Sequence, residues 1–270
     1  MMRIKAHTYS FFIAIADFVI SLFNEFTAMV FLASEMVMWS FLSLVSGGKT
    51  TRRGEFVRNG LDYGLGAVPI IGLIMFLIGF ISALQSAAQL RMVGGNIFVA
   101  DLLAVGITAE MGPLMAAIII AGRSGSAIAS EVATMKFSEE IDALKTMGLN
   151  PVRFIMVPKL WAMLLALPVL TMFSNFMGIL GGTIIAVTYL KLSFAAFWLQ
   201  LSQALVFKHI LSGLIKSLVF AVLITVIGCH KGLRFTGGAD GVGRATTASV
   251  VTSIFAIIAA DSLFGVLFYF

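Results

Sequence analysis

Five long apolar stretches limit the folds that this chain can adopt. They cover residues 64–84, 98–121, 160–189, 206–229 and 249–270. A helix needs about 20 such residues to cross a hydrocarbon core of about 30 Å. Only 11% of the 270 residues are charged and the mean hydropathy is +1.04, whereas about a quarter of the residues in a soluble domain are charged. The sequence therefore predicts an all-α polytopic membrane protein with five transmembrane helices. The third stretch is long enough to need tilt or a break, which we expect at Pro168.

An N-terminal segment, residues 11–45, is also apolar but is interrupted by polar residues. Asp17, Asn24, Glu25 and Glu35 are spread along it. Its length would allow a sixth span, yet scattered acids suit a helix that lies in the membrane interface. We favour the interfacial placement. The chain then divides into an N-terminal interfacial helix region, residues 1–60, and a transmembrane domain, residues 61–270.

The basic residues predict the orientation in the membrane. With five spans and a cytoplasmic N-terminus, fourteen of the 18 Lys and Arg residues lie on the cytoplasmic side. Arg91, Lys191 and Lys208 lie outside, and Lys216 falls within a span. This distribution follows the positive-inside rule and puts the C-terminus on the outer side. It also explains the net charge of +5 without nucleic-acid binding. A sixth span would move only Arg3 and Lys5, so the distribution does not decide between five and six.

A polar segment, residues 121–151, separates the second and third spans and carries seven charged side chains. Ser138 is a favourable N-cap and Gly148 a favourable C-terminal stop, so we predict a cytoplasmic helix of about ten residues between them. Such an amphipathic helix is either a docking element or a helix on the lipid surface; its acids mildly disfavour a negatively charged leaflet. The residues assigned to it are Ser138, Glu139, Glu140, Ile141, Asp142, Leu144, Lys145 and Met147.

Three ionisable residues fall within the spans: Glu110, Lys216 and Asp261. A charge at the bilayer centre costs at least about 2.5 kcal/mol, so such residues usually face protein or water. They either line a substrate path or gate, or form a structural network in which Lys216 pairs with one acid. In the second case burial would favour the neutral form of the acid left over.

The sequence gives little support to an enzyme. His7, His209 and His230 are scattered and have no metal-ligand spacing, and Cys229 is the only cysteine. The segment Ser-Gly-Gly-Lys-Thr at 46–50 resembles a phosphate-binding loop, but Ser43 stands where that motif needs glycine. We therefore expect no metal, no directly bound cofactor and no catalytic residue. An oligomeric ion channel with rings of acids, or a membrane scaffold, are the alternatives to a transport subunit.

Several blocks of the chain closely resemble the MlaE-like (YrbE-type) permeases, the membrane subunits of lipid-transporting ABC systems linked to MCE-domain proteins. The blocks keep the family's order and spacing from about residue 60 to the C-terminus. They are "AEMGPLMAAIIIAGR" at 109–123, the run at 121–162, "GLIKSLVFA" at 213–221, "GVGRATTASVV" at 241–251 and "AADSLFG" at 259–265. One position departs from many relatives, which carry Arg where this chain has Ala109.

The resemblance implies a homodimeric permease in the cell inner membrane that moves phospholipid. It implies five transmembrane helices preceded by an N-terminal elbow helix, with the C-terminus in the periplasm. It also implies a cytoplasmic ABC ATPase that uses ATP, an MCE-domain partner on the periplasmic side and a small accessory cytoplasmic subunit. Residues 138–147 would be the coupling helix that contacts the ATPase.

Overall fold

The computed structural model describes residues 2–45 and 53–269, and within these ranges the regular secondary structure is entirely helical. The phosphate-loop-like segment at 46–50 lies outside the described residues. The first elements are α1 (Met2–Val45), α2 (Arg53–Gly64), η1 (Leu65–Ala67), α3 (Val68–Leu90), η2 (Arg91–Val93) and η3 (Asn96–Phe98). They are followed by α4 (Val99–Val105), η4 (Gly106–Met111), α5 (Gly112–Ile120), η5 (Ala121–Gly125), α6 (Ser126–Phe137) and α7 (Glu140–Thr146). The last are η6 (Val152–Met156), α8 (Val157–Thr188), α9 (Phe194–Ala204), α10 (Phe207–Leu233) and α11 (Ala239–Tyr269).

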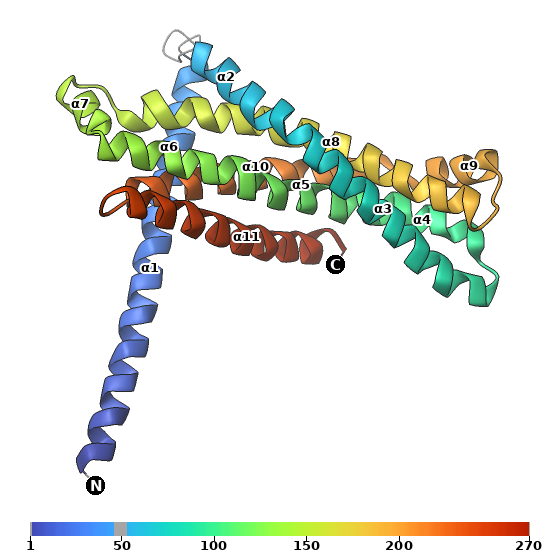
Figure 1. The fold of residues 1–270 in the computed structure, drawn as a ribbon, viewed down its shortest axis with the longest axis horizontal. Helices are drawn as coiled ribbons and strands as arrows, with labels where there is room; N and C mark the ends of the chain where they lie inside the picture. The colour runs from blue at the N-terminus through green and yellow to red at the C-terminus, as the bar shows by residue number, and fades with distance from the viewer. Residues whose placement is uncertain (1, 46–52, 270) are drawn as a thin grey trace.

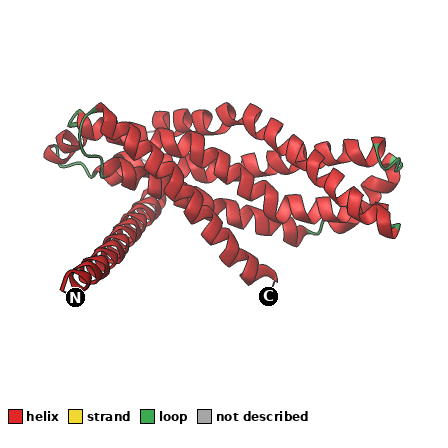
Figure 2. Cartoon of the chain, turned by 60° about the horizontal axis from the view of Figure 1, so that its bottom comes forward, coloured by secondary structure: helices red, strands yellow, loops and turns green. Residues whose placement is uncertain are grey.

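The long helices form an elongated bundle whose two ends differ. α7 lies at one end and α9 at the other (Figure 1), and we call these the α7 end and the α9 end. α1 crosses the bundle steeply near the α7 end, with its N-terminal half projecting away (Figures 1 and 2). The bundle axis and α1 therefore point in clearly different directions.

Within residues 2–45 and 53–269, six helical segments are long and apolar enough to cross a membrane. Five of them overlap the five predicted stretches to within two residues of the predicted ends that they do not enclose, and the sixth, Phe23–Ser43, lies within α1. The segment Asn96–Phe137 has 42 residues, which corresponds to about 63 Å at 1.5 Å per residue and exceeds the hydrocarbon core. The prediction ended this helix at residue 121. The structure continues it through η5 and α6 to Phe137, so part of the bundle extends beyond the bilayer.

Glycines allow α3 and α8 to pack backbone to backbone. A Cβ on Gly79 would overlap the carbonyl of Gly178, and a Cβ on Gly181 would overlap the carbonyl oxygen of Phe76. Gly178 and Gly182, spaced as Gly-x-x-x-Gly, also lie in close packing, because added Cβ atoms would crowd Ile107 and Leu103 respectively. Small residues permit this approach, which supplies much of the packing between membrane helices. α8 continues through Pro168 without the expected break.

Candidate functional site

A buried charge cluster joins three helical segments in the half of the bundle nearer the α9 end. Lys216 of α10 is 1% exposed, and its Nζ lies 2.5 Å from Glu110 Oε2 of η4. Asp261 Oδ1 of α11 lies 2.9 Å from the same nitrogen, a contact between charges without an aligned hydrogen bond. The side chains of Glu110 and Asp261 are 27% and 15% exposed. The three residues singled out from the sequence therefore lie together.

The contacts agree with the structural network, one of the two interpretations of these residues, in that Lys216 pairs with acids. Asp261 is the acid left without a hydrogen bond from the lysine, but the same ammonium group lies 2.9 Å from its carboxylate. With all three groups ionised the cluster has a formal charge of −1.

Local backbone structure brings Glu110 to this position. η4, which contains it, is a π-helical turn, and such turns inside α-helices occur frequently at functional sites. Gly213 of α10 lies so close to η4 that a Cβ would overlap the carbonyl oxygen of Thr108. Because Gly213 is one helical turn before Lys216, this close approach sets the distance that the lysine must span.

α7 is shorter than predicted and begins differently. Ser138 is the C-cap of α6, not the N-cap of α7, and its Oγ donates to the carbonyl oxygen of Thr134 at 3.1 Å. Glu139 takes the N-cap position with a left-handed φ of 59°, which turns the chain sharply between the two helices. The predicted stop is confirmed: Gly148 has a φ of +74° and its N–H bonds to the carbonyl oxygen of Lys145 at 2.9 Å.

The two faces of α7 have different partners. Ile141 is 3% exposed and belongs to the protein core, whereas Met147 is 65% exposed; Leu144 lies between them and is half-buried. Asp142 and Lys145, three residues apart on the helix, pair at 2.8 Å, and this hydrogen bond lowers the pKa of the Asp142 carboxyl. The surface offered to a partner therefore contains Glu139, Glu140, Asp142, Lys145 and Met147, and excludes Ile141.

Ion pairs and a hydrogen bond attach α1 to the α7 end of the bundle. Glu25 contacts Lys231 at 2.8 Å and Arg234 at 3.5 Å, near the end of α10. Glu35 Oε1 accepts a hydrogen bond of 3.0 Å from Asn150 Nδ2, in the loop after α7. These acids were noticed in the sequence only as interruptions of an apolar segment. Their partners lie more than 100 residues away along the chain, so local pattern could not identify them.

Two further contacts at this end also escaped the sequence analysis. The guanidinium of Arg153 lies 5.0 Å from the centre of the Trp39 ring, which ties α1 to η6. The ammonium group of buried Lys159 lies 2.5 Å from Glu131 of α6. The sequence alone places Lys159 among the cytoplasmic basic residues. It gives no sign that this side chain is buried, because the burial depends on helices that are distant in sequence.

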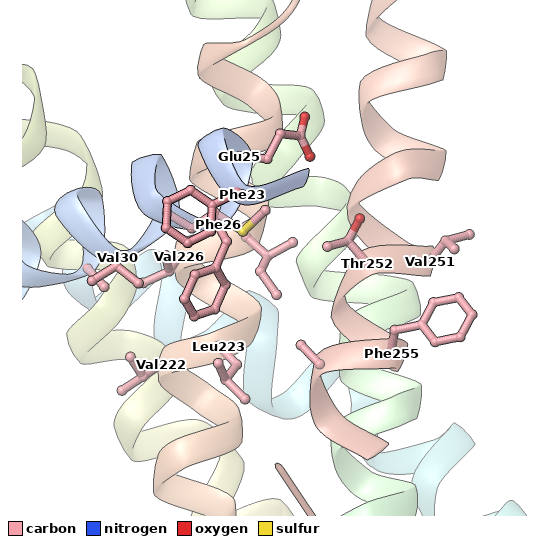
Figure 3. Close-up of a pocket in the computed structure, with 14 residues that line it drawn as sticks. Phe23, Glu25, Phe26, Val30, Val222, Leu223, Val226, Val251, Thr252 and Phe255 are labelled. Carbon is pink, nitrogen blue, oxygen red and sulfur yellow. The ribbon is translucent and has the colours of Figure 1, made fainter. Parts of the chain in front are cut away.

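An apolar groove of about 790 Å³ opens between α1, α10 and α11. Figure 3 shows side chains of α1 and α10, including Phe26 and Leu223, on one side of the groove and Thr252 of α11 on the other. Glu25 is its one charged lining residue. Leu223 lies seven residues from Lys216, or about 10 Å along α10. The groove and the charge cluster therefore lie along the same helices.

Among the described residues, no group of three His, Cys, Asp or Glu side chains could hold a metal ion. The site instead combines an apolar groove, a nearby charge cluster and a short exposed helix at one end of a membrane-spanning bundle. This arrangement can bind an amphipathic molecule and contact a soluble partner.

Comparisons with known proteins identify the family. The model of the family "Permease MlaE" matches residues 56–267. A probable ABC transporter permease protein of Rickettsia prowazekii is 33% identical over 79% of this chain and 82% of its own length. The intermembrane phospholipid transport system permease protein MlaE of Haemophilus influenzae is 30% identical over 73% of this chain and 76% of its own. The chain is also similar to TRIGALACTOSYLDIACYLGLYCEROL 1, a chloroplastic protein of Arabidopsis thaliana, with 34% identity over 71% of this chain and 55% of that protein. The chain therefore belongs to the MlaE permease family and is a multi-pass membrane transport subunit.

Proposed function

We propose that this protein is the permease subunit of an ABC transporter that moves phospholipid between the inner membrane and an MCE-domain periplasmic partner. A separate cytoplasmic ATPase hydrolyses the ATP. Membership of the MlaE permease family carries this proposal, and the name of the Haemophilus influenzae relative supports phospholipid as the substrate. The groove and charge cluster supply the amphipathic surface that such a substrate needs.

The ATPase would dock on α7. This helix lies at one end of the bundle (Figure 1), carries exposed charges and is held in place by buried Ile141. Force applied to α7 would reach α8 directly through the short connection between them. It would reach α1 through the bond between Asn150 and Glu35. In this proposal the exposed residues of α7 contact the ATPase, and buried Ile141 holds α7 against the rest of the bundle.

Lipid would use the groove for its acyl chains and the charge cluster for its headgroup. The groove lining is apolar apart from Glu25 and Thr252, as hydrocarbon requires. Glu110 is the most exposed member of the cluster and lies on a π-helical turn. A formal charge of −1 would favour headgroups that carry an amine. In this proposal the lysine both holds the helices together and limits how strongly the acids attract the headgroup.

We further propose that five helices cross the membrane and that α1 lies in the cytoplasmic interface. The steep crossing of α1 over the bundle supports this placement (Figures 1 and 2). With the α7 end in the cytoplasm, the N-terminus is cytoplasmic and the C-terminus periplasmic, in agreement with the distribution of basic residues. A second copy would cover part of α11, where Phe255, Leu263 and Leu267 are exposed, and complete a homodimer. A small accessory cytoplasmic subunit is part of the same proposal.

Affinity purification from native membranes in mild detergent tests the assembly. Mass spectrometry of the purified material should identify an ABC ATPase, an MCE-domain protein and bound phospholipid. The Met147→Asp variant should lose the ATPase and keep the MCE partner, because the two would bind opposite ends of the bundle. An oligomer that purifies with neither partner would favour the ion-channel or scaffold alternative.

A further inference from the structure

The α9 end carries an exposed aromatic surface whose residues have no role in the proposed function. The rings of Phe194 and Trp198 are 60% and 53% exposed and stack with centroids 6.1 Å apart. The opposite face of α9 is buried through Phe197 and Leu201. α9 therefore has one face packed on the bundle and one apolar face turned outward. We call Phe194, Trp198 and the exposed cations Arg91, Lys191 and Lys208 the α9 surface.

The position of α9 is fixed by polar contacts. The hydroxyl of Ser193 accepts a hydrogen bond of 3.2 Å from the Ala196 N–H and caps the helix. The side-chain amide nitrogen of Gln200 lies 2.8 and 3.0 Å from the two carboxylate oxygens of Asp101 in α4. These contacts fix the position of α9, and with it the two outward rings, along the axis of the bundle.

The end of the bundle that carries these rings has more basic than acidic residues. Residues 85–109 and 186–212, which build this end, contain Arg91, Lys191 and Lys208 but only one acid, Asp101. All three cations are exposed, and none forms an ion pair with another described residue. The guanidinium of Arg91 lies 6.0 Å from the centre of the Tyr189 ring. Asp101 accepts hydrogen bonds from Gln200 and keeps its negative charge, so three cations against one acid leave this end with a net positive charge.

We propose that the α9 surface binds anionic phospholipid headgroups of the outer leaflet. Amphipathic aromatic rings settle at the headgroup level of a bilayer, and long basic side chains reach from that level to lipid phosphates. α10 begins immediately beside this surface, at Phe207, so the membrane boundary falls where the rings and cations meet. Charge complementarity favours lipid phosphate over an acidic protein, because the exposed cations accompany exposed apolar rings, and a bilayer surface offers both phosphate and hydrocarbon. This inference rests on the proposed orientation, with the α9 end on the outer side, and does not rest on the proposed transport of lipid.

Quenching of tryptophan fluorescence by brominated lipid tests the proposal. The chain has three tryptophans, and Trp39→Phe with Trp161→Phe leaves Trp198 as the only one. This variant would be placed in phosphatidylcholine nanodiscs containing equal fractions of brominated phosphatidylglycerol or brominated phosphatidylcholine. Lipids with bromine either near the headgroup or near the end of the acyl chain would be compared. The stronger quencher of the two reports the depth of Trp198 in the bilayer. Arg91→Gln, Lys191→Gln and Lys208→Gln together remove the charge; Arg58→Gln, Lys145→Gln and Arg244→Gln form the matched control with the same net change.

We expect Trp198 to be quenched most by bromine near the headgroup. Phosphatidylglycerol should bind about five-fold or more tightly than phosphatidylcholine, the factor expected from one basic residue at an anionic surface. The triple variant at the α9 end should lose this preference, and the control triple should keep it. Equal quenching by both lipids, or a preference that survives in the triple variant, would overturn the proposal. Absence of quenching by either lipid would also overturn it and would indicate that protein covers α9.

Discussion

Replacing Lys216 with Met is the sharpest test of the buried charge cluster. The substitution removes the only cation between Glu110 and Asp261 but keeps a long apolar side chain. Removing one partner of a buried ion pair costs about 3–5 kcal/mol. The acids here are 27% and 15% exposed and can recover some solvation, so we expect about 3 kcal/mol, the lower limit of that range.

Thermal unfolding in nanodiscs measures this loss. A chain of this size shifts its midpoint by about 2–4 °C per kcal/mol, so the variant should unfold about 6–12 °C below the wild type. Lys208→Met, on the same helix but exposed, is the control and should have little effect.

A triple variant separates charge from packing. Glu110→Gln, Lys216→Met and Asp261→Asn together remove every formal charge from the cluster and should recover most of the lost stability. The reasoning is refuted if Lys216→Met unfolds at the wild-type temperature, or if the triple variant is less stable than the single one. Lipid transport by a stable triple variant would show that the cluster is structural; loss of transport would support contact with the headgroup.

Three further predictions follow from burial. Met147→Asp should reduce ATPase binding without changing thermal stability, whereas Ile141→Asp should lower the unfolding temperature, because only the second side chain is buried; binding and melting measured on both variants check this. Glu131→Gln should cost about 2–3 kcal/mol and Lys159→Met less, since the first leaves a buried ammonium group unpaired and the second leaves a half-exposed carboxylate; the order of their melting temperatures decides. Gly181→Ala should cost about 1–3 kcal/mol by forcing α3 and α8 apart, and an unchanged melting temperature would contradict the proposed close packing.

Hydropathy predicted the helical membrane fold because each span must be apolar over most of its length. It could not predict where the helices end outside the bilayer, since the second span continues to Phe137 through residues that look like a loop. The capping preference of Ser138 was also misleading. That preference does not say which of two adjacent helices the residue caps, and the left-handed Glu139 is what separates them.

The candidate site was partly visible in the sequence. Charged residues are so rare within spans that Glu110, Lys216 and Asp261 stood out, and the structure brings them together. The contacts of α1 were not visible, because Glu25 and Lys231 are 206 residues apart. The three-residue spacing of Ile141 and Leu144 puts both on one face of α7. It could not show that Ile141 faces the core, and its substitution therefore tests stability rather than coupling.

Transfer of labelled phospholipid by the reconstituted complex tests the central claim most directly. Proteoliposomes would contain the permease and its ATPase, with the MCE-domain partner present, and labelled lipid would be followed between the bilayer and that partner. The account predicts transfer that requires ATP and is lost in the Met147→Asp variant. Transfer at the same rate without ATP, or ion conductance without lipid transfer, would contradict it.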